Sequence, residues 1–218
     1  SECYGVGDIS KISVKQNAIE LLRKELKSKR GNKATIGTGS MNDPYMPVEK
    51  ELEMTRKALQ VLSDFKFPVH IITKSDLVTR DLDLLKEISR TYAAVSITIT
   101  TFDDKLASRI EHNAPVPSKR FEVLRLLAKH GIYAGITLLQ ILPFINDTSD
   151  NIRRIISKAK DCGAKYAIPM VGMTLRKGSR DYYYKELDRM DIFLRSQYEQ
   201  TDGEQYECMS PNVRQLWE

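Results

Sequence analysis

The sequence predicts one α/β domain built on a parallel sheet that curves into a partial barrel. Short apolar segments alternate with amphipathic segments at intervals of roughly 25–40 residues, the pattern of repeated strand–helix units. The apolar segment 67–73 is hydrophobic on both faces, which is typical of strands buried between layers. With 218 residues, the chain is long enough for one large core.

Each expected strand is a short apolar run that ends in small or polar residues. These runs lie at 33–38, 67–73, 93–100, 132–142 and 164–171. The expected helices carry apolar residues at helical spacing, at 13–30, 47–65, from about 80, from about 104, 118–130, 148–163 and 180–198. Strands joined by helices run parallel through right-handed connections. We assign 1–200 to the barrel domain and 201–218 to a C-terminal tail.

Composition narrows the classes of protein that remain. The chain has 34 basic and 29 acidic residues, a net charge of +5, which permits but does not require a nucleic-acid partner. No apolar run approaches the ~20 residues of a membrane span, and the first residues do not read as a signal peptide. Cys3, Cys162 and Cys208 are too scattered for a disulfide framework or a metal cluster, and no metal ligand is assigned. We therefore expect a cytoplasmic protein.

Polar residues gather where the expected strands end or face inward. Carboxyl ends of parallel strands meet at one edge of a sheet, where ligands of α/β proteins bind. In the third strand, hydroxyl residues alternate with apolar ones, which places them together on one face. The candidate ligand-binding residues from these two patterns are Ser40, Asn42, Asp43, Lys74, Ser96 and Thr98. Two alternatives stay open: an ordinary strand–helix turn at 37–49, and a lysine that only covers apolar surface.

Several segments together resemble radical S-adenosylmethionine proteins of the spore photoproduct lyase-like group. The resemblance extends from the first residue to about Arg176. It rests on residues 37–49 (GTGSMNDPYMPVE), 71–81 (IITKSDLVTRD), 95–101 (VSITITT), 111–115 (EHNAP) with Arg120, and 141–145 (ILPFI).

The resemblance implies a fold, two cofactors and a set of contacts. The fold is a partial (β/α)6 barrel, in which a Cys-x3-Cys-x2-Cys loop after the first strand binds a [4Fe–4S] cluster beside S-adenosylmethionine. By position, Ser40, Asn42 and Asp43 would lie at the methionine amino group, and Lys74 would bind its carboxylate. Ser96 and Thr98 would contact the ribose or the carboxylate. Leu139 and Met170 would pack against the adenine.

The sequence departs from this family at the cluster loop. It contains no Cys-x3-Cys-x2-Cys, and its first expected strand corresponds to the second strand of the family. The expectation is a chain without the cluster-binding segment, which by itself neither holds the cluster nor cleaves the cofactor. An extended version would encode the three cysteines. The alternatives are a non-catalytic α/β barrel and a nucleic-acid-binding module that uses the basic excess and the tyrosines at 182–184.

Overall fold

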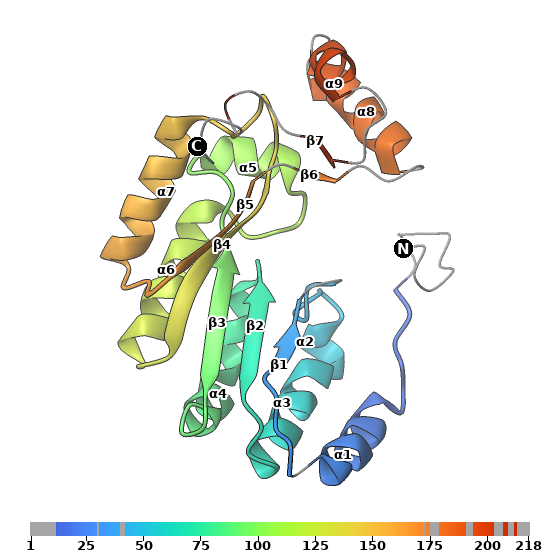
Figure 1. Cartoon of the computed structure of the whole chain (residues 1–218), viewed down its shortest axis with the longest axis vertical. Helices are drawn as coiled ribbons and strands as arrows, with labels where there is room; N and C mark the ends of the chain where they lie inside the picture. The colour runs from blue at the N-terminus through green and yellow to red at the C-terminus, as the bar shows by residue number, and fades with distance from the viewer. Residues whose placement is uncertain are drawn as a thin grey trace.

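A five-stranded parallel sheet forms the centre of the molecule. The computed structural model describes residues 12–29, 31–39, 42–171, 173–174, 179–190, 194–202, 207–208 and 212. The strands follow one another across the sheet in chain order, so that β1 and β5 are its two edges (Figure 1). They are β1 (Ile36–Thr38), β2 (Val69–Thr73), β3 (Ala93–Thr98), β4 (Tyr133–Ile141) and β5 (Ala167–Val171). This order confirms the predicted partial parallel barrel.

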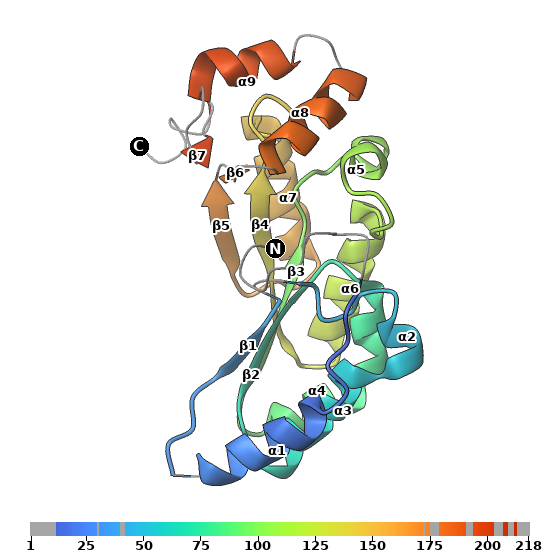
Figure 2. The same cartoon turned by 90° about the vertical axis from the view of Figure 1, so that its right-hand side faces the viewer.

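Helices cover one face of this sheet. Figures 1 and 2 show α3, α4, α6 and α7 against it, with α1 packed on α3. The described helical elements that precede β5 in the chain are α1 (Ala18–Ser28), α2 (Glu49–Leu52), α3 (Met54–Asp64), the 3-10 helix η2 (Asp76–Asp81), α4 (Leu82–Ile88), α5 (Asp104–Ile110), α6 (Pro117–Lys129) and α7 (Ser149–Asp161). Alternate strand residues such as Ile71, Val95 and Ile136 are buried here with Leu85 and Leu124 of the helices, and these side chains form the main core.

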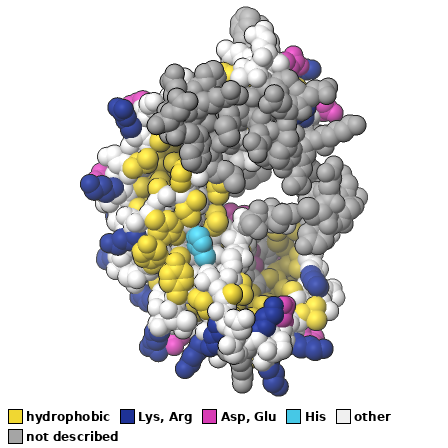
Figure 3. All heavy atoms as spheres, in the orientation of Figure 1, with side chains coloured by type: hydrophobic (Ala, Val, Ile, Leu, Met, Phe, Trp, Pro, Cys, Tyr) yellow, Lys and Arg dark blue, Asp and Glu magenta, His cyan; other side chains and the backbone are white. Residues whose placement is uncertain are grey.

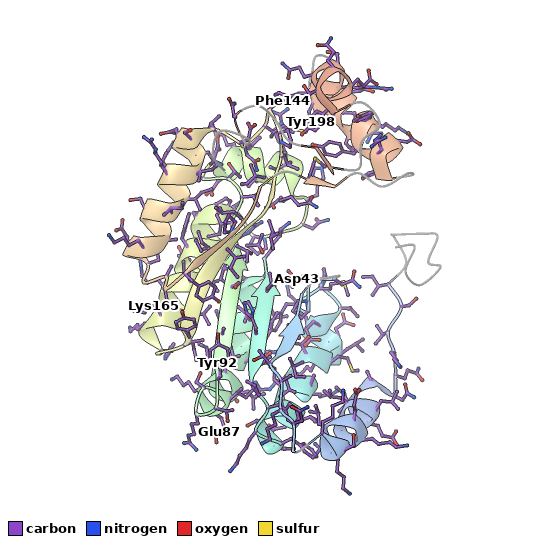
Figure 4. All side chains as sticks on the ribbon, in the orientation of Figure 1. Asp43, Glu87, Tyr92, Phe144, Lys165 and Tyr198 are labelled. Carbon is purple, nitrogen blue, oxygen red and sulfur yellow. The ribbon has the colours of Figure 1, made fainter. Side chains whose placement is uncertain are left out.

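The other face of the sheet carries the polar and aromatic side chains. Residues alternate in direction along a strand, so His70, Ser96 and Thr98 point away from the core residues beside them. This confirms that Ser96 and Thr98 share the face opposite the helices. Tyr92 and Tyr133 are 43% and 46% exposed at the amino-terminal end of the sheet. Figure 3 shows hydrophobic side chains gathered on the side of the molecule where Figure 4 places Tyr92.

A second, smaller core lies beyond the carboxyl ends of β4 and β5. It contains α8 (Ser179–Met190), α9 (Leu194–Asp202) and a two-stranded ribbon of β6 (Met173–Thr174) and β7 (Glu207–Cys208). Tyr198 is fully buried, and its hydroxyl donates to the carbonyl of Pro143 at 2.7 Å. Its ring also meets Phe144 edge-on (Figure 4). These contacts attach α9 to the loop after β4.

Two of the predicted helices are divided. The segment 47–65 forms α2 and α3, because Glu53 between them adopts a left-handed conformation with φ of 50°. The Glu49 carboxylate folds back and accepts hydrogen bonds from the backbone N–H of Thr55 and Arg56, at 2.9 and 3.3 Å. A side chain thereby satisfies the first amides of α3, so a new helix can begin there. The segment 180–198 is likewise shared between α8 and α9.

Candidate functional site

A hollow of about 770 Å³ opens at the carboxyl end of the sheet. Its walls are the loop after β1, the start of η2 and the loop between α5 and α6. Figure 4 shows Asp43 at this end of the strands, whereas Lys165, Tyr92 and Glu87 lie at the opposite end. The charged and titratable side chains that line the hollow are Asp43, Tyr45, Lys50, Lys74, Asp76, Glu111 and His112. Because acidic and basic groups share the wall, it suits a zwitterionic ligand.

Asp43 fastens the loop after β1 to the end of β2. One carboxylate oxygen accepts hydrogen bonds from the backbone N–H of Tyr45 at 2.9 Å and the Thr73 hydroxyl at 2.6 Å. The other accepts from the backbone N–H of Lys74 at 2.7 Å. A carboxylate offers about four acceptor positions, so roughly one remains for a ligand donor. Asp43 and Lys74 are therefore brought together, as the sequence predicted for two residues at neighbouring strand ends.

A buried ion-pair network lies under this loop. Asp81 is fully buried and accepts from the guanidinium groups of Arg56 and Arg80, each at 2.9 Å, and from the Tyr45 hydroxyl at 3.1 Å. Arg80 also binds the buried Glu49 carboxylate at 2.7 Å. Burial, followed by the nearby Asp81 charge, raises the pKa of Tyr45, so this residue stays a hydroxyl donor. The network joins the 42–50 loop to η2 and so holds one wall of the hollow.

Lys74 is engaged by a partner that the sequence analysis did not assign. Its ammonium group lies 3.0 Å from the Glu111 carboxylate, which in turn is paired with the buried Arg120. Burial alone would raise the pKa of Glu111, but the positive charges of Lys74 and Arg120 outweigh it and hold that pKa below its usual value. Glu111 is therefore ionised at neutral pH. The quoted segment 111–115 and Arg120 belonged to the family resemblance, yet no sequence signal joined them to Lys74.

Ser96 and Thr98 lie deeper in the sheet. Both are buried and line no part of the hollow. The Ser96 hydroxyl is 2.8 Å from His70 Nε2 and 3.0 Å from the Tyr166 hydroxyl, and Thr98 bonds to Thr137 at 2.7 Å. Burial lowers the pKa of His70 and raises the pKa of Tyr166 to about 12. In this structure these hydroxyls bind protein groups, and their contact with a ligand stays a prediction.

Three further predicted residues, Asn42, Leu139 and Met170, belong to the loop after β1, to β4 and to β5. Asn42 is exposed and lines a neighbouring hollow together with Asp43. Leu139 is half-buried in β4, and Met170 occupies a position in β5. Ser40 lies outside the described residues. Of the predicted residues that the structure describes, Asp43 and Lys74 line the large hollow, and a ligand contact of the others stays a prediction.

Comparison with known proteins assigns the family. The Radical SAM superfamily profile matches residues 7–173. The chain belongs to the radical SAM superfamily. Solved structures agree on the fold. One is a spore photoproduct lyase mutant with bound AdoMet and dinucleoside spore photoproduct. The match covers 77% of this chain and 49% of the lyase chain, with a TM-score of 0.56 and 11% sequence identity. Streptococcus suis SuiB bound to S-adenosylmethionine matches 79% of the chain and 39% of its own, with a TM-score of 0.51 and 11% identity.

Sequence relatives come from archaea, bacteria and phages. An uncharacterized protein of Methanocaldococcus jannaschii is 34% identical over 78% of this chain and 60% of its own length. A Mycobacterium tuberculosis protein, also uncharacterized, is 24% identical over 87% of the chain and 56% of its own. A Pseudomonas phage M6 protein named radical SAM Nalpha-GlyT isomerase is 25% identical over 72% of the chain and 32% of its own. The radical SAM chain thus spans little more than half the length of the archaeal and mycobacterial relatives.

The residues of this radical SAM chain do not fit the iron–sulfur cluster that the family implies. The sequence has three cysteines, and none lies within a Cys-x3-Cys-x2-Cys pattern. Cys162 is a buried free thiol at the end of α7. In the described part of the chain, no group of three or more His, Cys, Asp and Glu side chains could hold a metal ion. A separate point concerns membranes. No helix in the described part of the chain is long and apolar enough to cross a bilayer.

Proposed function

We propose that the hollow beside Lys74 binds S-adenosylmethionine within a radical SAM enzyme. The observation that carries this proposal is that Lys74 and Asp43 line the same 770 Å³ hollow at the carboxyl end of a parallel sheet, where the Asp43 carboxylate accepts from the Lys74 backbone N–H. The hollow lies within the roughly 300–1,000 Å³ range of small-molecule sites. The Lys74 ammonium would bind the methionine carboxylate, and the open acceptor position of Asp43 would take the amino group.

The same proposal limits what this chain does alone. S-adenosylmethionine would be bound and oriented here, while the electron that cleaves it in this family comes from a cluster whose three thiolates this sequence does not supply. We expect the purified chain to stay colourless after anaerobic incubation with iron, sulfide and a reductant, and to release no 5′-deoxyadenosine. A cytoplasmic location belongs to this proposal, because widely spaced cysteines with a free buried thiol at Cys162 suit a reducing compartment.

Replacement of Lys74 by alanine tests the binding proposal. The change removes the cation that would contact the carboxylate, and a hydrogen bond to a charged group is worth about 1.5–3 kcal/mol. We therefore expect Lys74→Ala to weaken S-adenosylmethionine binding by about 10–100-fold, as measured by isothermal titration calorimetry. Lys165→Ala is the control, because it also replaces one lysine by alanine, but at the opposite end of the sheet (Figure 4). Equal affinities of the two variants would contradict the proposal.

A nucleic-acid substrate is the second candidate function. A hollow of about 470 Å³ between α5 and α8 is lined by Arg109, Tyr182 and Tyr183, and by Arg189, which is paired with Glu186 at 2.6 Å. Tyr182 is 60% exposed, so its ring is available for a base to stack on. Within the described part of the chain, no carboxylate is paired with Arg109. The combination of an exposed ring and a guanidinium suits a base and its phosphate.

Salt dependence tests this second candidate. Binding of a fluorescent single-stranded oligonucleotide should weaken as salt rises, because phosphate contacts release counterions. If Arg109 contacts one phosphate, Arg109→Ala should reduce the slope of log K against log salt by about 0.7. Lys165→Ala should leave the slope unchanged. Absent binding, or binding that does not respond to salt, would remove the nucleic-acid candidate without affecting the cofactor proposal.

A further inference from the structure

Three charged side chains from three separate elements meet at one wall of the hollow. Lys74 follows β2, Glu111 directly follows α5, and Arg120 belongs to α6. Glu111 lies between the two cations: one carboxylate oxygen is 3.0 Å from the Lys74 ammonium, and the other is paired with Arg120. The side chains are 38%, 10% and 1% exposed, in the order Lys74, Glu111, Arg120. The three side chains therefore form a row that runs from the hollow into the interior of the protein.

The inner end of this row is fixed. Arg120 donates from Nε to the carbonyl of Pro115 at 2.6 Å and from Nη1 to the carbonyl of Thr98 at 2.9 Å. Its remaining nitrogen faces Glu111. A buried guanidinium is costly unless its charge and its donors are both satisfied, so Arg120 and Glu111 depend on each other. Arg120 is thus fixed to the loop before α6 and to the end of β3. Through this guanidinium, the Glu111 carboxylate is held in one place.

The outer end of the row needs such an anchor. A lysine side chain has four carbon–carbon bonds of freedom, and ordering it costs up to about 2 kcal/mol. Lys74 follows β2, and its ammonium has three N–H donors, of which the pair with Glu111 occupies one. Among the residues that the structure describes, the other two have no partner, and Lys74 lines the hollow. A cation that is already ordered binds an anion more tightly than one that must be ordered on binding.

We propose that Glu111 is a positioning residue, which holds the Lys74 ammonium at the wall of the hollow for the carboxylate of the bound cofactor. This inference rests on the proposed function, because it assumes that the hollow receives S-adenosylmethionine. Glu111 itself does not contact the ligand in this proposal. Its effect reaches the ligand only through Lys74, and only through the part of the ligand that Lys74 binds.

Two ligands separate this role from a general structural one. S-adenosylhomocysteine carries the amino-acid part, whereas 5′-methylthioadenosine has the same thioether nucleoside without it. We expect Glu111→Gln to weaken S-adenosylhomocysteine binding by about 5–10-fold and to change 5′-methylthioadenosine binding by less than about 2-fold, since a freed Lys74 must be ordered again. In a Lys74→Ala background, Glu111→Gln should have no further effect on either ligand.

The outcomes are distinct. Equal loss of both ligands, tighter S-adenosylhomocysteine binding, or further loss in the Lys74→Ala background would each overturn the role of Glu111 and leave the cofactor site standing. A wild-type chain that binds neither ligand would remove the proposed function and this inference with it. If Glu111→Gln fails to fold by circular dichroism, Glu111→Asp replaces it. That variant keeps the charge beside Arg120 but is one methylene too short to reach both cations, so the same ligand-selective loss is expected.

Discussion

Replacement of Asp81 by asparagine is expected to destabilise the protein by about 3–5 kcal/mol, the range found when one partner of a buried ion pair is removed. The measurement is equilibrium unfolding in urea, where a loss of this size lowers the midpoint by roughly 1.5–2.5 M for a slope near 2 kcal/mol/M. The isosteric change keeps the size of the side chain, so the expected effect comes from charge.

The position of Asp81 explains the size of this effect. Its carboxylate is fully buried and neutralises the guanidinium groups of both Arg56 and Arg80. An asparagine would keep one acceptor oxygen, but its NH₂ group, itself a donor, would face donors that the second carboxylate oxygen now satisfies. Arg80 would retain the Glu49 carboxylate at 2.7 Å. Part of the network therefore survives, which keeps the expected loss within the range for a single pair.

Asp83 is the matched control for Asp81. It also pairs with Arg56, at 2.7 Å, but its side chain is 60% exposed. The hydrogen bond from Arg56 lowers the pKa of Asp83 to about 2, yet water screens an exposed pair, so Asp83→Asn should cost no more than about 1 kcal/mol. If Asp81→Asn and Asp83→Asn lowered the free energy of unfolding by similar amounts, burial of Asp81 would not be what sets its contribution to stability.

The sequence predicted those parts of the fold that depend on local pattern. Apolar runs ending at Thr38 and Thr73 became β1 and β2, and the alternation around Ser96 and Thr98 correctly predicted their shared face. Parallel strand direction followed from the helical connections. These features are encoded by neighbours in the chain, so periodicity alone can reveal them.

Features that depend on distant contacts could not be predicted in this way. Residues 47–65 have a continuous helical pattern, but the helix divides because the Glu49 side chain returns to bind the first amides of α3. From the sequence, Asp81 looks like an ordinary acidic residue near the start of a helix. Its partner Arg56 is distant in the chain and is brought to it only by the fold. Lys74 was a sound candidate from its place after β2. Its partner Glu111, however, is separated from it by α4, β3 and α5.

Replacement of Gly39 by alanine should have the second large effect, a loss of about 2–5 kcal/mol. Gly39 directly follows β1 and has a φ of +93°, a conformation that costs an L-residue roughly 1–2 kcal/mol. An added Cβ would also lie 2.1 Å from the carbonyl oxygen of Ile72. Backbone in a central strand cannot move aside without disturbing the sheet, and such overpacking costs about 1–3 kcal/mol more. Urea unfolding measures the sum.

Gly37→Ala separates this steric effect from a general loss of glycine. A Cβ at Gly37 would meet no atom of the described residues within 4 Å. Alanine restricts the unfolded chain more than glycine does. The free energy of unfolding of this variant should therefore equal that of the wild type or exceed it by up to about 1 kcal/mol. Gly39→Ala should also weaken S-adenosylmethionine binding, since a displaced chain after β1 would carry Asp43 away from the Lys74 amide that it holds at 2.7 Å. A stable Gly39→Ala variant with unchanged affinity would show that the close approach to Ile72 does not position the site.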